Sequence, residues 1–179
     1  MKEYGNHPPV FLVGPRCCGK TTVAGLLARR LGFAGLDTDV LLAAKAGMDV
    51  PAIVAREGWS GFRRRESLAL EEAAMPGTVV ATGGGMVLLP ENRAFMRAAG
   101  VVVYLRAPAQ VLAARLAGDG GAARRPSLTG EDPQAEMASV LAEREPLYRE
   151  SAHYCVDATL RPEAVVAAIA GFLELSKPL

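Results

Sequence analysis

The stretch that decides the fold of this chain is Gly14-Pro15-Arg16-Cys17-Cys18-Gly19-Lys20-Thr21. It fits the phosphate-binding pattern G-x-x-x-x-G-K-[ST]. An apolar run at 10–13 precedes it, and a segment with helical apolar periodicity, 23–31, follows it. This order predicts a strand, a tight phosphate-binding loop and a helix. An ordinary glycine-containing turn is the alternative, and the flanking segments argue against it.

Such a loop binds polyphosphates because several backbone N–H groups converge on the anion and the N-terminus of the next helix favours negative charge. Lys20 would carry a mobile charge to the outer phosphates. The Thr21 hydroxyl would be a ligand for a Mg²⁺ ion that bridges those phosphates. The positions expected to bind the nucleotide here are Gly14, Cys17, Cys18, Gly19, Lys20, Thr21 and Thr22.

Length and composition predict one soluble domain spanning 1–179. Half of the residues are hydrophobic, 22% are charged, and the formal net charge is +1, which calls for neither nucleic acid nor an anionic membrane as a partner. The first residues do not resemble a signal peptide, and no window approaches the ~18 apolar residues of a membrane span. We expect a cytoplasmic monomer whose three cysteines are reduced.

Short apolar runs alternate with helical stretches along the chain. Strands are predicted at 10–13, 34–36, 78–82, 101–105 and 154–156, and helices at 20–31, 40–46, 51–57, 61–74, 91–98, 109–116, 132–149 and 162–175. This alternation favours a parallel sheet with helices on both faces. The predicted fold class is therefore α/β, with three layers.

Two aspartates, Asp37 and Asp39, end the second predicted strand. Ligands of a parallel sheet gather at the carboxyl ends of the strands, so these carboxylates would face the same crevice as the phosphate loop. One would hold magnesium through water, and the other would orient and deprotonate the hydroxyl that attacks phosphorus. The alternative is that one of them only caps the following helix.

Three consecutive arginines, Arg63, Arg64 and Arg65, fall in a predicted helix. Successive helical side chains are about 100° apart, so at most two of the three can point inward. A planar guanidinium suits bidentate recognition of a carboxylate, and the alternative is a solvated basic face. Arg144, near the end of a long helix, is open to the same two interpretations, as a ligand or as a structural ion-pair partner.

Three glycines, Gly83, Gly84 and Gly85, follow the third predicted strand. Such a run costs backbone entropy, which favours close approach of the main chain to a ligand over a plain turn. A tight strand-to-helix connection is the alternative.

The segment 118–126 is rich in glycine and has almost no core-forming side chains. It is a candidate mobile flap, in which Arg124 or Arg125 would close over a phosphoryl group. A solvated surface loop is the alternative.

Taken in order, these motifs resemble shikimate kinase. The matching pieces are the phosphate loop, Asp37-Thr38-Asp39, Gly61-Phe62-Arg63, Thr82-Gly83-Gly84-Gly85, the Arg-Pro of the flap, and Arg144-Glu145-Pro146-Leu147-Tyr148. The resemblance runs from residue 10 to the last helix and includes the long flap of one bacterial isoform. It implies a P-loop kinase fold of the nucleoside-monophosphate-kinase type, with a five-stranded parallel sheet, a substrate-binding region at about 38–66 and a mobile lid at about 117–131.

The resemblance also implies a reaction and a role for each matching residue. The reaction is transfer of the γ-phosphoryl group of ATP, with Mg²⁺, to the 3-hydroxyl of shikimate, a step toward chorismate and the aromatic amino acids. The implied catalytic residues are Lys20, Asp39 and Arg125; the metal contacts are Thr21 and Asp37; the shikimate contacts are Asp39, Arg63, Gly83, Gly84, Gly85 and Arg144; and the further nucleotide contacts are Arg115, Arg125 and Arg161.

Two other functions stay open on the residues alone. The same scaffold phosphorylates other small acceptors, such as gluconate, which also has a carboxylate, or a nucleoside monophosphate. A non-catalytic module that senses a metabolite is a different class, and the intact Lys20, Asp39 and Arg125 argue against it.

One position departs from the family pattern, because glycine is usual where this chain has Cys17. If the backbone there requires a positive φ, a residue other than glycine would cost on the order of 1 kcal/mol or more.

Overall fold

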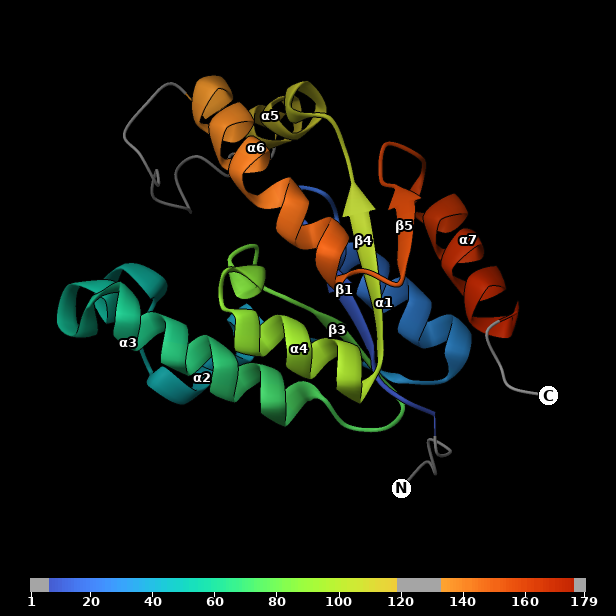
Figure 1. The fold of residues 1–179 in the computed structure, drawn as a ribbon, viewed down its shortest axis with the longest axis horizontal. Coiled ribbons are helices and arrows are strands. Elements are labelled where there is room, and N and C mark those ends of the chain that lie inside the picture. The colour runs from blue at the N-terminus through green and yellow to red at the C-terminus, as the bar shows by residue number, and fades with distance from the viewer. Residues whose placement is uncertain (1–6, 119–132, 176–179) are drawn as a thin grey trace.

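The computed structural model describes residues 7–118 and 133–175 of the chain. The strands in these ranges are β1 (Val10–Val13), β2 (Ala34–Asp37), β3 (Thr78–Ala81), β4 (Val101–Arg106) and β5 (Tyr154–Asp157). They form one parallel sheet in the order β2-β3-β1-β4-β5 (Figure 1). The predicted five-stranded parallel sheet is confirmed.

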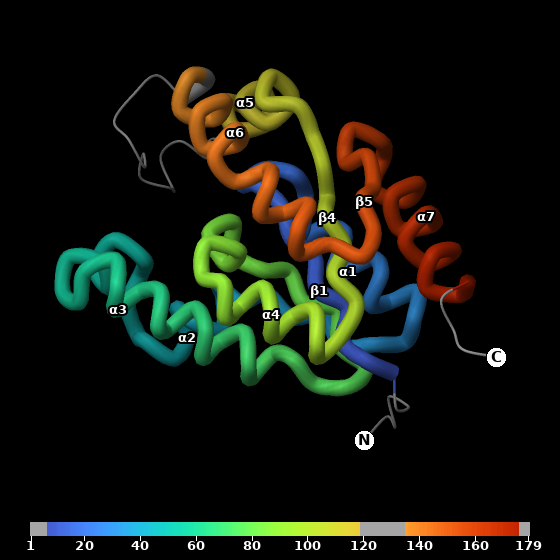
Figure 2. Tube along the Cα trace, in the orientation of Figure 1, coloured from blue at the N-terminus to red at the C-terminus, as the bar shows by residue number. Residues whose placement is uncertain are grey.

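Helices connect and cover these strands. They are α1 (Lys20–Leu31), α2 (Thr38–Ala46), α3 (Val50–Ala73), α4 (Pro90–Ala99), α5 (Ala109–Gly118), α6 (Pro133–Ser151) and α7 (Pro162–Leu175), with a short 3-10 turn η1 (Met86–Leu88). The predicted segments 51–57 and 61–74 are the two parts of α3, which has non-helical backbone at Gly58 (φ 69°, ψ 176°). In Figure 2, α2 and α3 lie at one end of the molecule and α7 at the other.

The predicted start of α2, residue 40, is wrong by two residues. The helix begins at Thr38 because the Asp37 side chain caps it, accepting hydrogen bonds from the backbone N–H groups of Asp39 and Val40. Thr38 and Asp39 therefore belong to the first turn of a helix rather than to the end of a strand.

The central strand β1 contributes side chains to the cores on both faces of the sheet. Val10 and Leu12 pack in one apolar cluster, with side chains of α1, α5 and α7. Phe11 and Val13 pack in the other, with side chains of α3, α4 and α6. A strand buried on both faces reads as a continuous apolar run, and the result is the predicted three-layer arrangement.

Parallel pairing puts the carboxyl ends of β1, β2 and β3 at one edge of the sheet. The main chain after β3 is held beside β1, because both the backbone N–H and the Oγ1 of Thr82 donate to the carbonyl of Leu12, at 3.2 and 2.9 Å. The phosphate loop after β1 and the glycines after β3 are therefore neighbours. No helix in the described part of the chain is both long and apolar enough to cross a lipid bilayer.

His153 joins the end of α6 to the sheet. Its Nδ1 accepts a hydrogen bond from the backbone N–H of Val102 (3.0 Å), and its own N–H donates to the Val102 carbonyl (2.8 Å). Desolvation, and then the charge of Arg97, lower the pKa of His153 below its ordinary value. The neutral imidazole is thus the form that the folded state prefers.

We predict that His153 lowers the free energy of unfolding as the pH drops below about 6.5, the ordinary pKa of histidine. A lowered pKa in the folded state gives stability that is present above the unfolded pKa and is lost as the pH falls through the folded pKa. Urea unfolding at several pH values should show a shallower decline for His153→Asn, in which an amide oxygen replaces the acceptor. The matched control is His7→Asn, which alters the other histidine of the chain. An unchanged decline in His153→Asn would contradict the prediction.

Candidate functional site

The phosphate loop connects β1 to α1, as the sequence predicts. Its backbone has a positive φ at Gly14 (147°), Cys17 (65°) and Gly19 (95°). The Nζ of Lys20 donates hydrogen bonds to the carbonyls of Gly14 (2.8 Å) and Pro15 (2.7 Å). The lysine is therefore folded over its own loop, held by neutral acceptors that anionic phosphate oxygens can replace.

The other positions predicted to bind nucleotide differ in their exposure and in their contacts with this loop. Cys18 is buried, whereas Thr21 and Thr22 are exposed on the first turn of α1. Arg115, on α5, donates to the Ala158 carbonyl (2.8 Å) and to the Cys17 carbonyl (3.4 Å), so it ties the segment after β5 to the phosphate loop. Arg161 is exposed in that same segment, just before α7. Arg125 and the lid beyond residue 118 lie outside the described residues.

Thr21 and Asp37 meet at the end of β2. The Thr21 hydroxyl donates to Asp37 Oδ2 at 2.7 Å, while Asp37 Oδ1 caps α2. Asp37 therefore does cap the helix, but it does not only cap it, because the same carboxylate also binds Thr21 beside the phosphate loop. In the described ranges no group of three or more His, Cys, Asp or Glu residues is placed to hold a metal. Mg²⁺ needs few protein ligands when phosphates and water supply the rest, so the Thr21 and Asp37 oxygens fit it.

The three glycines after β3 make room for side chains of neighbouring helices. A Cβ on Gly83 would lie 2.8 Å from Asp39 Oδ1 and 2.9 Å from Glu66 Oε1. A Cβ on Gly85 would lie 2.1 Å from an Arg63 nitrogen. The Gly83 N–H already donates to the Thr38 hydroxyl (3.0 Å). Residues 83–85 are therefore a strip of bare main chain against which charged side chains pack.

Among the three consecutive arginines, Arg63 is the one that points to this strip. Its guanidinium pairs with the Glu66 carboxylate and lies 5.4 Å from the Phe62 ring centre and 5.7 Å from that of Trp59. Arg64 is exposed, and Arg65 makes two 2.8 Å hydrogen bonds to Glu57. The inward direction of Arg63 agrees with the interpretation of this residue as a ligand contact. The exposure of Arg64 agrees with the interpretation of a solvated basic face.

Glu66 is a site residue that the sequence reasoning missed. Its side chain is only 4% exposed. Burial raises its pKa, the Arg63 charge opposes that rise, Asp39 adds to it and Arg144 also opposes it. These four groups thus share one electrostatic neighbourhood. The sequence does carry one signal for Glu66: it lies three residues after Arg63, so the two side chains share one helical face.

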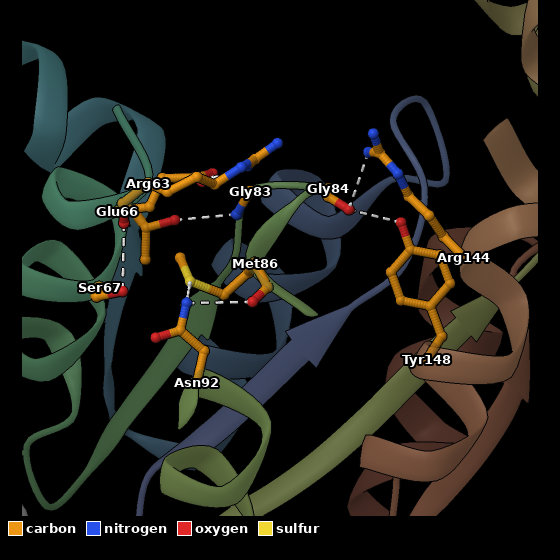
Figure 3. Close-up of polar contacts among 10 residues, drawn as sticks. Arg63, Glu66, Ser67, Gly83, Gly84, Met86, Asn92, Arg144 and Tyr148 are labelled. Carbon is orange, nitrogen blue, oxygen red and sulfur yellow. Dashed lines mark hydrogen bonds and ion pairs between the residues drawn. The ribbon is translucent and has the colours of Figure 1, made fainter. Parts of the chain in front are cut away.

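Arg144 reaches the glycine strip from α6, on the side opposite Arg63 (Figure 3). The Gly84 carbonyl accepts hydrogen bonds from Tyr148 Oη (2.7 Å) and from an Arg144 terminal nitrogen (3.5 Å). Burial raises the pKa of the Tyr148 hydroxyl, which stays protonated and able to donate. The Arg144 Nε is buried with no hydrogen-bond partner among the described residues. The sequence motif that contains Arg144 also contains Tyr148, but its role could not be read from the sequence, because it depends on contact with Gly84.

This arrangement suits phosphoryl transfer to an anionic acceptor. The phosphate loop and the glycine strip lie side by side, a carboxylate at Asp39 faces the strip, and two guanidinium groups flank it. A guanidinium pair recognises a carboxylate, and a carboxylate orients a hydroxyl nucleophile.

Comparison with known proteins agrees with this geometry. A family model described as shikimate kinase matches residues 16–174. The chain is 57% identical over 161 residues to "Shikimate kinase 2" of Dickeya chrysanthemi, covering 90% of this chain and 93% of that protein. It is 56% identical over 160 residues to "Shikimate kinase 2" of Yersinia enterocolitica, covering 89% and 92%.

Solved structures extend the comparison. The shikimate kinase from Acinetobacter baumannii, solved in complex with shikimate, superposes with a TM-score of 0.90 at 36% identity, covering 99% of each chain. A gluconokinase from Sinorhizobium meliloti has a TM-score of 0.58 at 17% identity, covering 96% of this chain and 94% of that one. The likeness to the gluconokinase shows a shared fold alone.

Cys17 is the only residue other than glycine with a positive φ in the described ranges. Position 17 therefore does require a positive φ. This left-handed conformation costs a residue with a Cβ about 1–2 kcal/mol.

We predict that Cys17→Gly is more stable than Cys17→Ala by about 1 kcal/mol, because both lose the thiol and only glycine relieves the left-handed strain. Chemical denaturation of the two variants measures the difference. In ordinary backbone the order is the reverse, with alanine the more stable, and that order would contradict the prediction.

Proposed function

Because the chain belongs to the shikimate kinase family, we propose that its site transfers the γ-phosphoryl group of ATP to the 3-hydroxyl of shikimate. Family membership makes the chain an ATP-dependent kinase. The observation that carries the assignment of roles is the convergence of Asp39, Arg63 and Arg144 on the glycine strip, next to the phosphate loop.

On the nucleotide side, the loop amides and the N-terminus of α1 would hold the ATP phosphates. Lys20 would exchange the Gly14 and Pro15 carbonyls for phosphate oxygens, which attract its ammonium more strongly. By family resemblance, Arg115 and Arg161 would lie toward the adenine; Arg115 binds the segment after β5, and Arg161 belongs to it. Arg125, by family resemblance, would add a positive charge to the transferring phosphoryl group.

Thr21 and Asp37 would hold a Mg²⁺ ion at the outer phosphates, Thr21 directly and Asp37 through water. Their oxygens are 2.7 Å apart and both belong to the donor class that Mg²⁺ prefers. When bound, the ion would neutralise charge that develops on the phosphoryl oxygens. Binding there would also break the Thr21 to Asp37 hydrogen bond, while Asp37 Oδ1 kept its cap on α2.

On the acceptor side, Arg63 and Arg144 would pair with the shikimate carboxylate from opposite sides of the strip. Glu66 and the rings of Phe62 and Trp59 would hold the Arg63 guanidinium in place before shikimate arrives. The exposed Asp39 carboxylate would accept a hydrogen bond from the 3-hydroxyl and take its proton as the oxygen attacks phosphorus. Catalysis would then consist of positioning and charge neutralisation.

We further propose that the chain acts as a single-domain cytoplasmic monomer with no nucleic acid or membrane partner. The net charge of +1 supports this, because a nucleic acid or an anionic membrane would attract a strongly basic surface. In this domain, residues from about 38 to 66 would form the substrate-binding region and those from about 117 to 131 the lid.

The direct test is ADP release from MgATP by the purified protein. We expect strong stimulation by shikimate and little by gluconate, nucleoside monophosphates or no acceptor. Stimulation by another acceptor would keep the kinase fold and overturn the assignments of Arg63 and Arg144. Absence of turnover with every acceptor would favour a metabolite-sensing module.

We predict that Asp39→Asn lowers kcat at least 10²-fold, since loss of a general base typically removes 10²- to 10⁴-fold of rate. Shikimate binding should remain measurable through Trp59, which is the single tryptophan of the chain and lies beside Arg63. A kcat within a few fold of the wild type would exclude Asp39 as the base.

We predict that Gly85→Ala raises the KM for shikimate at least 10-fold and leaves the KM for ATP within 2-fold. The added methyl would stand 2.1 Å from an Arg63 nitrogen and displace the guanidinium, and misplacing a binding group by about 1 Å can cost 10²-fold in rate. Gly84→Ala is the matched comparison, because its methyl would find its nearest neighbour at 3.5 Å. Equal effects of the two variants would refute the steric explanation.

A further inference from the structure

An ion pair joins the phosphate loop to α6. An Arg16 terminal nitrogen donates to Glu136 Oε1 at 2.7 Å, across 120 residues of sequence. The Arg16 side chain is 18% exposed and that of Glu136 is 1% exposed. A carboxylate buried to this degree requires compensation, which Arg16 and the first turn of α6 supply together. The pair is therefore part of the packed interior rather than a surface contact.

The main chain of Arg16 lies next to the glycine strip. The position of a Cβ on Gly84 would be 3.5 Å from the Arg16 nitrogen and 3.7 Å from the Gly14 carbonyl oxygen. On its other side, the Gly84 carbonyl receives the hydrogen bonds of Arg144 and Tyr148. Arg16 is thus bonded to α6 directly, at Glu136, and its main chain lies near Gly84, whose carbonyl binds Arg144 and Tyr148 of the same helix.

Arg144 depends on the position of its helix. Its contact with the Gly84 carbonyl, at 3.5 Å, is at the outer limit of a hydrogen bond, and its buried Nε has no partner among the described residues. Side-chain bonds alone therefore fix it weakly. Glu136 precedes it on the same helix by on the order of 12 Å of axial rise. A displacement of the start of α6 would therefore be passed along the helix toward Arg144, which lies two residues before the internal Pro146.

The hydrogen bonds that Lys20 makes within the phosphate loop would change when a polyphosphate enters it. Lys20 has to leave the carbonyls of Gly14 and Pro15, and Pro15 is bonded to Arg16. A change in the loop backbone would therefore move Arg16, whose guanidinium is bonded to Glu136.

We propose that Arg16 is a positioning residue that, through its ion pair with Glu136, transmits occupancy of the phosphate loop to Arg144 in the acceptor site. Nucleotide binding then improves the alignment of Arg144 with the acceptor carboxylate, and by thermodynamic linkage the acceptor improves nucleotide binding by the same factor. This inference rests on the proposed function, because it takes Arg144 to bind the shikimate carboxylate.

The experiment measures the coupling between the two ligands. The dissociation constant of shikimate is determined from Trp59 fluorescence with and without saturating MgADP. For the wild type we expect MgADP to tighten shikimate binding about 5-fold or more, the usual lower range of such couplings. In Glu136→Gln, which keeps the shape of the side chain and removes its charge, the ratio should fall to less than 2-fold.

Arg16→Met should lose the coupling to the same extent, and the double variant Arg16→Met/Glu136→Gln should lose no more than either single variant. Arg16→Lys, which keeps the charge, should recover part of it. Because Arg16→Met removes the guanidinium partner of a buried carboxylate, Glu136→Gln is the decisive variant where Arg16→Met folds poorly.

Glu150→Gln is the matched control. Glu150 also pairs α6 with an arginine, Arg93 of α4 at 3.2 Å, and this pair does not contact the phosphate loop. Its coupling should equal that of the wild type. Undiminished coupling in Glu136→Gln, or equal loss in Glu150→Gln, would overturn the inference and leave the proposed function intact. Failure of the wild type to bind shikimate at all would overturn the proposed function, and the inference with it.

Discussion

The structure depends on the pairing of β1 with strands on both of its sides. Parallel pairing with β3 and β4, with both faces buried, leaves Val10–Val13 no freedom to shift without exposing its apolar side chains. The chain that leaves β1 must then emerge beside the chain that leaves β3, and the two hydrogen bonds from Thr82 to the Leu12 carbonyl hold them together. In the proposed reaction, the phosphoryl donor and its acceptor would meet because the phosphate loop and the glycine strip are adjacent at this edge of the sheet.

Charge at the acceptor site is nearly balanced before any ligand arrives. Glu66 pairs directly with Arg63, and the Asp39 carboxylate and the Arg144 guanidinium lie along the same strip of bare main chain. Such a set avoids the cost of burying like charges together, and it leaves each arginine able to take a further acceptor oxygen. An anionic acceptor would add to an organised set of charges, so little reorganisation would accompany its binding.

Local signals account for what the sequence predicts well. Apolar periodicity and glycine placement foretell the strands, the phosphate loop and the break in α3, because each is decided within a few residues. The start of α2 was missed because it depends on a side-chain cap from Asp37. The roles of Glu66, Tyr148 and Arg16 were missed for a different reason: the partners of these residues lie on other elements or become relevant only after Arg63 is known to point inward. Contacts between distant segments leave no periodic trace in a single sequence.

The break in α3 has a consequence for acceptor size. Glu57 and Arg65 lie on either side of Gly58, and the two hydrogen bonds between their side chains connect the two parts of the bent helix. Beneath it, Leu42 of α2, Ile53 before the break and Phe62 after it share one apolar cluster. The corner that presents Arg63 and Glu66 is therefore braced on both sides. Bending this corner to admit a bulkier acceptor would have to break the Glu57–Arg65 hydrogen bonds and disturb the apolar cluster, which would disfavour such a molecule.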